Sequence, residues 1–224
     1  VVSAHIERIQ AVNPMLNAVI ADRFEAAREE AVEASRLFKR RGKKDLPPLL
    51  GIPCTVKEFC GVEGMPQTGG VWARRHQTAD QDGEVVRRLR EAGAIILGIT
   101  NAPEGGVWHE TSNPVFGRTN NPWDTNRTCG GSSGGEAAIL AAGGAVFGVG
   151  SDVGGSIRIP SAFCGIIGHK PTHRLVPATG HFPPAIGGSV APFTIGPMCR
   201  KVSDIMPLLK IMAGPDGKDP LCVE

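Results

Sequence analysis

Three short segments concentrate side chains that could carry out chemistry. They are residues 55–58 (Thr-Val-Lys-Glu), 130–136 (Gly-Gly-Ser-Ser-Gly-Gly-Glu) and 150–158 (Gly-Ser-Asp-Val-Gly-Gly-Ser-Ile-Arg). A serine becomes a good nucleophile when a base removes its proton, and a lysine can be that base once its ammonium form is disfavoured. Paired glycines let backbone N–H groups approach a developing anion. Together these residue types predict covalent catalysis by a serine.

Each segment also has a simpler explanation. A lysine at a strand end is usually a solvated charge, and Lys57 could pair with the neighbouring Glu58. A Gly-Gly-Ser-Ser-Gly-Gly run is usually a flexible linker. Here a helix is expected directly after Gly135 and an apolar strand directly before Gly150, so the context argues against a linker.

Two motif resemblances fail on context. Gly130-x-Ser132-x-Gly134 matches the nucleophile elbow, but the preceding residues 124–128 are polar where a buried strand is needed. Gly148-x-Gly150 opens a pattern like the dinucleotide fingerprint, yet the third glycine, Gly154, comes one position late. No Lys-Ser/Thr pair follows the glycine run, which excludes a Walker-type phosphate loop.

The elements that must position these segments follow from hydrophobic periodicity. Apolar runs predict strands over 52–56, 95–99 and 145–149, while helical spacing predicts helices over 3–11, 22–40, 82–92, 136–142 and 203–212, with Asp82 capping the third helix. Apolar strands that alternate with helices predict an α/β fold with a mixed, mostly parallel sheet covered by helices on both faces. No linker divides the chain, so we expect a single domain over 1–224.

Composition narrows the function classes. Lys+Arg total 24 against 22 Asp+Glu, a formal net charge of +2, so no general field attracts nucleic acid. The six cysteines show no C-x-x-C spacing, which excludes a zinc knuckle and favours reduced thiols in an intracellular protein. The longest uncharged stretch, 175–199, holds five prolines and four glycines and predicts no spanning helix. The chain does not begin with Met, and we expect a fragment of a longer protein.

Taken together, the three segments resemble the amidase signature family. The serine of the third segment follows the first serine of the glycine run by 24 positions, with the lysine upstream. The resemblance continues through residues 160–165 (Pro-Ser-Ala-Phe-Cys-Gly) and 168–172 (Gly-His-Lys-Pro-Thr). The Gly-Gly-Glu ending, the Gly-His-Lys-Pro run and residues 196–200 are most similar to the fatty-acid amide hydrolases of that family.

The resemblance implies a Ser–Ser–Lys triad. Ser156 is then the nucleophile, Ser132 is a bridging serine after a cis peptide bond with Gly131, and Lys57 is the base. It also implies an oxyanion hole formed by the backbone N–H groups of residues 153–156, namely Val153, Gly154, Gly155 and Ser156.

Other residues are expected to support this site. We expect Ser133 and Ser151 to form hydrogen bonds within the loops, and Asp152 and Arg158 to pair beside the nucleophile. The six histidines are scattered, so His169 and His181 are read as structural. Apolar side chains that could line an acyl channel are Phe59, Met65, Trp72, Phe163, Phe182 and Phe193.

The function that the resemblance implies is hydrolysis of fatty-acid primary amides and N-acylethanolamines, without metal or organic cofactor. It also implies a small-molecule lipid amide as substrate and no nucleic-acid partner. A homodimer, and a membrane or lipid-droplet association through segments outside this chain, are further expectations. Two alternatives stay open: the A-type component of an amidotransferase that works on charged tRNA, and a non-catalytic glycine-loop module that binds an anion.

Overall fold

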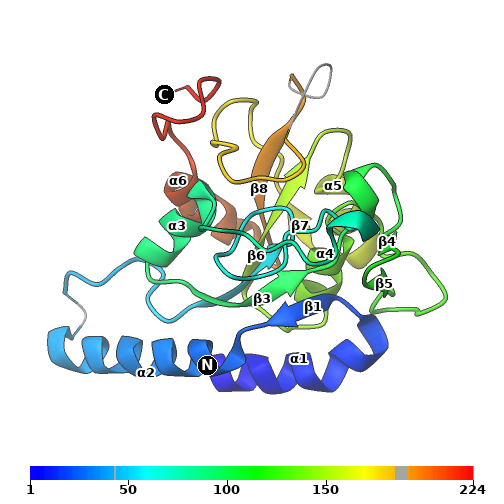
Figure 1. The fold of residues 1–224 in the computed structure, drawn as a ribbon. Helices are drawn as coiled ribbons and strands as arrows, with labels where there is room; N and C mark the ends of the chain where they lie inside the picture. Colours follow the sequence, from blue (N-terminus) through cyan, green and yellow to red (C-terminus); the bar gives the residue numbers. More distant parts are fainter. Residues whose placement is uncertain (43, 185–190, 224) are drawn as a thin grey trace.

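A six-stranded mixed sheet forms the centre of the computed structural model, which describes residues 1–42, 44–184 and 191–223 (Figure 1). The strand order is β1-β3-β2-β6-β8-β7. Strands β3, β2 and β6 pair in parallel, and β1 and β8 run antiparallel to their neighbours. Because β7 is antiparallel to β8, four of the six strands point the same way, as predicted for a mostly parallel mixed sheet.

The helices and strands occur in the following order. They are α1 (Val2–Leu16), β1 (Val19–Asp22), α2 (Phe24–Arg41), β2 (Pro53–Lys57), α3 (Glu84–Glu91), β3 (Ile95–Thr100), β4 (Ser112–Asn113), β5 (Gly117–Arg118), α4 (Gly134–Ala141), β6 (Phe147–Asp152), α5 (Arg158–Cys164), β7 (Ile167–Gly168), β8 (Thr194–Cys199) and α6 (Ile205–Met212), with short 3-10 turns at Trp72–Arg74, Glu104–Gly106 and Val202–Asp204.

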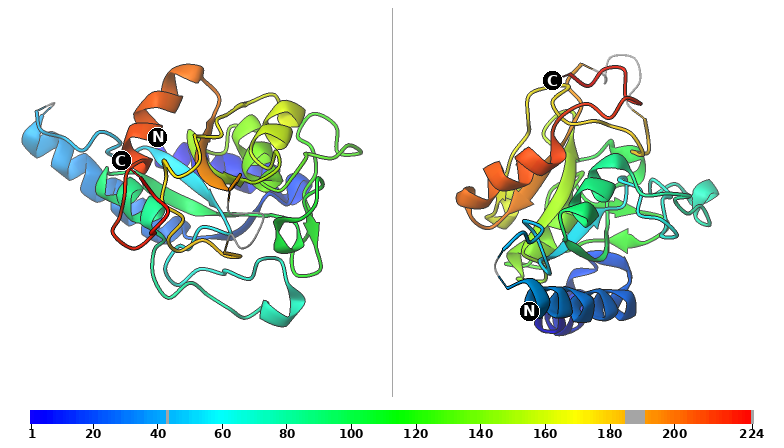
Figure 2. Two further views of the ribbon diagram at one scale, coloured as in Figure 1. Left: turned by 90° about the horizontal axis from the view of Figure 1, so that it is seen from above. Right: turned by 90° about the vertical axis from the view of Figure 1, so that its left-hand side faces the viewer.

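Helices cover both faces of the sheet. Side chains alternate along β3, so that Ile96 packs with α3 and α6 on one face while Ile95 and Leu97 pack with α1, α2 and α4 on the other. Figure 2 shows the pair α1 and α2 on the opposite side of the sheet from α6. The fold class predicted from the sequence is therefore confirmed.

The predicted elements are close to those observed, with one wrong cap. Helix α3 begins at Glu84 with Gly83 as its N-cap, so Asp82 does not cap it. The Asp82 carboxylate instead accepts the Glu63 N–H at 2.9 Å and pairs with Arg90 at 2.7 Å. Among the described residues, no helix combines the length and apolar composition needed to cross a membrane.

The carboxyl ends of two neighbouring parallel strands mark where a site can form. Strand β2 ends at Lys57 and β6 ends at Asp152, and the two strands pair from Cys54 to Val56. Loops beyond the carboxyl ends of parallel strands are the usual place for ligand binding in open α/β sheets. Two of the three segments singled out in the sequence therefore meet at this edge.

Candidate active site

Lys57 is the last residue of the central strand β2 and is almost completely buried, with 1% of its surface exposed. Its Nζ lies 2.6 Å from Ser132 Oγ and 3.1 Å from Ser151 Oγ. Burial, opposed only in part by the surrounding acidic groups, lowers the pKa of Lys57 from 10.5 to about 7. The side chain can therefore accept a proton near neutral pH.

The alternative pairing of Lys57 with Glu58 is not what the structure contains. The Glu58 carboxylate turns to the next loop, where it accepts hydrogen bonds from the Thr68 backbone N–H, from Thr68 Oγ1 at 2.6 Å and from the Gly69 N–H at 3.1 Å. In the part of the chain that the structure describes, Lys57 forms no ion pair within 4.0 Å.

The glycine-serine run is a buried structural segment. Residues 130–140 are all buried, and α4 begins at Gly134 directly after the two serines. Gly134 has to be glycine, because a Cβ there would collide with the Thr111 hydroxyl and with Cys129 Sγ. The linker interpretation is therefore wrong. The peptide bond between Gly131 and Ser132 is cis, as the family resemblance implies.

Ser156 lies on the loop that joins β6 to α5. Its carbonyl accepts the Ser133 N–H at 3.0 Å, which ties this loop to the glycine-serine run. The serine is partly exposed, whereas Ser132 is buried with 3% of its surface exposed.

Asp152 holds the Ser156 loop in shape. Its buried carboxylate accepts the N–H groups of Gly155 at 2.7 Å and Ile157 at 3.0 Å, and it pairs with the half-exposed Arg158 guanidinium at 3.0 Å. Burial alone would raise the pKa of Asp152, but these hydrogen bonds outweigh it and hold the pKa below its usual range. The expected pairing of Asp152 with Arg158 is present.

The four expected oxyanion donors are not equivalent. The Gly155 N–H already donates to Asp152, so the structure does not leave it free for an anion. Among the described residues, the N–H groups of Val153, Gly154 and Ser156 have no protein acceptor, and Val153 and Gly154 are exposed. The donors available at the cavity are thus three, rather than four.

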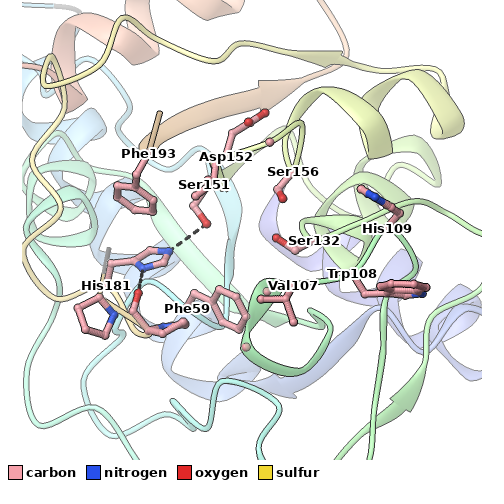
Figure 3. Close-up of a pocket in the computed structure, with 16 residues that line it drawn as sticks. Phe59, Val107, Trp108, His109, Ser132, Ser151, Asp152, Ser156, His181 and Phe193 are labelled. Atoms are coloured by element: carbon pink, nitrogen blue, oxygen red, sulfur yellow. Dashed lines mark hydrogen bonds between the residues drawn. The ribbon is translucent and has the colours of Figure 1, made fainter. Parts of the chain in front are cut away.

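The hydroxyls of Ser132 and Ser156 face one another across the upper part of a cavity of about 400 Å³ (Figure 3). Both side chains line this cavity, together with Ser151 and Asp152. No hydrogen bond between the two hydroxyls is present among the described residues, so the first link of the proton path is formed and the second is an approach of two side chains into shared space.

The cavity walls are largely apolar. Its lining residues are Phe59, Gly105, Gly106, Val107, Trp108, His109, Ser132, Ser151, Asp152, Val153, Gly154, Ser156, His181, Pro183, Pro184 and Phe193. Of the six apolar side chains proposed from the sequence, only Phe59 and Phe193 belong to this set. The segment 105–109 was missed because its glycines and aromatic residues carry no periodic pattern.

His181 is the polar residue of the cavity that sequence reasoning missed. Its Nε2 lies 2.9 Å from Ser151 Oγ and its Nδ1 lies 2.8 Å from the Pro183 carbonyl. Burial and the nearby Lys57 charge lower the pKa of His181 to about 3, so the ring is neutral. His169, by contrast, is not among the lining residues.

The two supporting serines differ in their contacts. Ser133 forms the expected bonds within the loops, with its Oγ 3.3 Å from the Ser151 carbonyl and 3.4 Å from the Ser151 N–H. The Ser151 hydroxyl does more than this, because it contacts both Lys57 and His181. Among the described residues, no group of three or more His, Cys, Asp or Glu side chains is arranged to hold a metal ion.

The two motif resemblances rejected at the outset also fail in the structure. No strand leads directly into Ser132, as a nucleophile elbow would require. Gly148 and Gly150 lie inside β6, so they form no phosphate-binding loop.

Comparison with known proteins identifies the family. The sequence model described as Amidase matches residues 1–224. The chain belongs to the amidase family. This confirms the resemblance drawn from the glycine-serine motifs.

Individual amidase-family proteins match nearly the whole chain. Fatty-acid amide hydrolase 2 of Homo sapiens is 49% identical over 97% of this chain and 42% of its own length. The A-type component of the glutamyl-tRNA(Gln) amidotransferase of Oleidesulfovibrio alaskensis is 40% identical over 99% of this chain and 44% of its own. The native peptide amidase structure from Stenotrophomonas maltophilia has a TM-score of 0.88 at 35% identity, covering 98% of this chain and 45% of that one. The chain therefore spans less than half the length of these relatives.

Proposed function

We propose that the protein hydrolyses amide bonds through an acyl-enzyme on Ser156. The observation that carries this proposal is the 2.6 Å contact between the buried Lys57 Nζ and Ser132 Oγ, beside a cavity that Ser132 shares with Ser156. The family of the chain and its 49% identity to a fatty-acid amide hydrolase support the same reaction class.

Acylation uses the proton path in one direction. The neutral Lys57 amine takes the Ser132 proton, while Ser132 Oγ takes the proton of Ser156 and Ser156 Oγ bonds to the amide carbonyl carbon. The carbonyl oxygen becomes an anion, and the N–H groups of Val153, Gly154 and Ser156 are the donors placed to bind it.

Collapse of this intermediate uses the path in reverse. The Lys57 ammonium returns its proton to Ser132, and Ser132 passes one to the departing nitrogen as the carbon–nitrogen bond breaks. An amine leaves far more readily than an amide anion, so the path serves both halves of acylation. Water then attacks the Ser156 ester and releases the carboxylic acid.

We further propose fatty-acid primary amides and N-acylethanolamines as substrates, and a single amidase-signature domain over residues 1–224. Support comes from the 49% identity to a fatty-acid amide hydrolase and from the apolar walls that Phe59, Val107 and Phe193 give the cavity. Homodimer formation, an intracellular location and membrane association stay predictions from the sequence.

An amidotransferase role is the second candidate, since a glutamyl-tRNA(Gln) amidotransferase component is 40% identical. The net charge of +2 offers little attraction for charged tRNA. A non-catalytic anion-binding module is the third, and it would need no neutral lysine beside the serines.

Labelling with a fluorophosphonate probe tests the proposal in the full-length protein. We expect covalent labelling that maps to Ser156 and disappears in Ser156→Ala, while the exposed control Ser203→Ala keeps it. A folded protein without labelling would support the anion-binding module. Rates with oleamide against a short-chain amide then test the substrate, and a preference for the short chain would contradict a lipid amide.

A further inference from the structure

A second hydrogen-bond chain reaches Lys57 from the side opposite Ser132. It runs from Lys57 Nζ to Ser151 Oγ over 3.1 Å, from Ser151 Oγ to His181 Nε2 over 2.9 Å, and from His181 Nδ1 to the Pro183 carbonyl over 2.8 Å. Figure 3 shows the last two contacts as dashed lines along one wall of the cavity. The proposed mechanism does not use this chain.

The direction of each hydrogen bond follows from its far end. A carbonyl oxygen can only accept, so His181 Nδ1 carries the hydrogen and Nε2 of the neutral ring is an acceptor. The Ser151 hydroxyl must therefore donate to His181, which leaves its oxygen lone pairs facing Lys57. Lys57 in turn donates an N–H to Ser151.

This order fixes the state of the lysine amine. A neutral amine has two hydrogens and one lone pair. If Ser151 were free to rotate, its O–H could donate to that lone pair and compete with Ser132. With His181 holding the Ser151 proton, the lone pair is available only to Ser132.

We propose that His181 is a positioning residue, which acts through Ser151 to reserve the Lys57 lone pair for the proton that leaves Ser132. The inference rests on the proposed function, because it assigns a role within that proton path. His181 is suited to it by its setting: Phe59 and Phe193 contact the ring edge-on, with centroids at 5.8 and 4.8 Å, so the ring cannot easily turn.

Other ionisable groups act on the same lysine and must be separated in any pH experiment. Glu58 and Cys60 follow on the same segment, Asp152 ends β6 and Glu136 lies on α4. Burial raises the pKa of Glu136 to about 7, so Glu136 can titrate in the same range as Lys57. Glu136→Gln therefore serves as the control that identifies its share of any pH profile.

The first test needs no substitution and no activity. Nitrogen-15 NMR of His181 in the full-length protein should show the hydrogen on Nδ1 and a neutral ring from pH 5 to 9. A hydrogen on Nε2, or protonation of the ring within this range, would overturn the proposal. Because this measurement is independent of turnover, its outcome is separate from success or failure of the proposed amide hydrolysis.

Substitutions then test the consequence for Lys57. In His181→Leu, Ser151 can donate to the amine, so kcat/KM should fall by about five- to tenfold and the acid limb of its pH profile should move to lower pH. His181→Gln keeps an acceptor within reach of Ser151 and should restore both. Equal losses in the Leu and Gln variants, or an unmoved profile, would contradict the role.

A double variant isolates the route through Ser151. Once Ser151→Ala removes the hydroxyl, adding His181→Leu should change neither rate nor profile further. A full additional loss would show that His181 acts on substrate directly. Should the Leu variant fail to fold, His181→Asn, whose shorter amide does not reach Ser151, replaces it in the same comparison.

Discussion

At the scale of single residues, burial gives Lys57 its chemistry. An exposed lysine is an ammonium ion at neutral pH and cannot take a proton. Removing water from Lys57 lowers its pKa to about 7, while Ser132 and Ser151 supply the polar contacts that remain. The same desolvation that creates the base also costs folding free energy.

That cost predicts a pH-dependent effect of Lys57→Met on stability. Between pH 7 and pH 10.5 the unfolded chain binds the Lys57 proton and the folded chain does not, so the wild type gains stability as pH rises through this range. Below pH 7 the full penalty, on the order of 4–5 kcal/mol, is present. The variant should therefore gain most, relative to wild type, near pH 6.5.

Urea unfolding at pH 6.5 and pH 9.5 measures this difference. Hydrogen bonds lost with Lys57 subtract a nearly constant amount, so the change with pH is what the prediction concerns. Lys210→Met, at an exposed position on α6, is the matched control. A stability difference that is the same at both pH values would argue against a depressed lysine pKa.

The site residues could be proposed from sequence only where they lie in recognisable local patterns. Ser132, Ser156 and Lys57 stand in motifs beside apolar elements, which made them visible. His181 stands in an uncharged, proline-rich stretch, and its role comes from Ser151, thirty positions away in sequence. The Gly155 N–H was misassigned because only the folded loop shows that Asp152 accepts it.

At the scale of elements, the loop from β6 to α5 sets the position of Ser156. Asp152 accepts three backbone N–H groups of this loop, and Gly155 adopts φ +120°, a conformation that other residues rarely adopt. A Cβ on Gly155 would also lie 2.7 Å from Ile159 Cδ1, whereas a Cβ on Gly154 would meet nothing within 4 Å.

Two neighbouring glycine substitutions should thus behave differently. Gly155→Ala should lower the free energy of unfolding by about 1–3 kcal/mol and slow fluorophosphonate labelling of Ser156. Gly154→Ala, the matched control, should change stability by less than about 0.5 kcal/mol. Thermal unfolding compares them, and equal losses in the two variants would refute the importance of the Gly155 backbone.

Hydrophobic patterns predicted the central elements well and the edges poorly. The expected strands over 52–56, 95–99 and 145–149 correspond to β2, β3 and β6, because a strand buried on both faces reads as an apolar run. Strand β8 was missed because Gly196 and Pro197 argue against a central strand. Helix α1 was ended too early because Pro14 lies inside its last turn.

At the scale of the whole molecule, the site depends on contacts between distant parts of the chain. Lys57 meets Ser132 across 75 positions and Ser151 across 94. Sequence patterns report local structure, so they could nominate these residues but not show that they touch. The family resemblance supplied that arrangement, and the parallel pairing of β2 with β6 gives its physical basis.

The pH dependence of acylation tests the central claim most directly, because it reports whether Lys57 is the base. In the full-length protein, kcat/KM for amide hydrolysis should fall about tenfold per unit below an apparent pKa near 7. In Lys57→Ala this limb should disappear, with a loss of about 10²–10⁴-fold at neutral pH that narrows at alkaline pH. The same limb persisting in Lys57→Ala, or an equal loss at neutral and alkaline pH, would contradict the account.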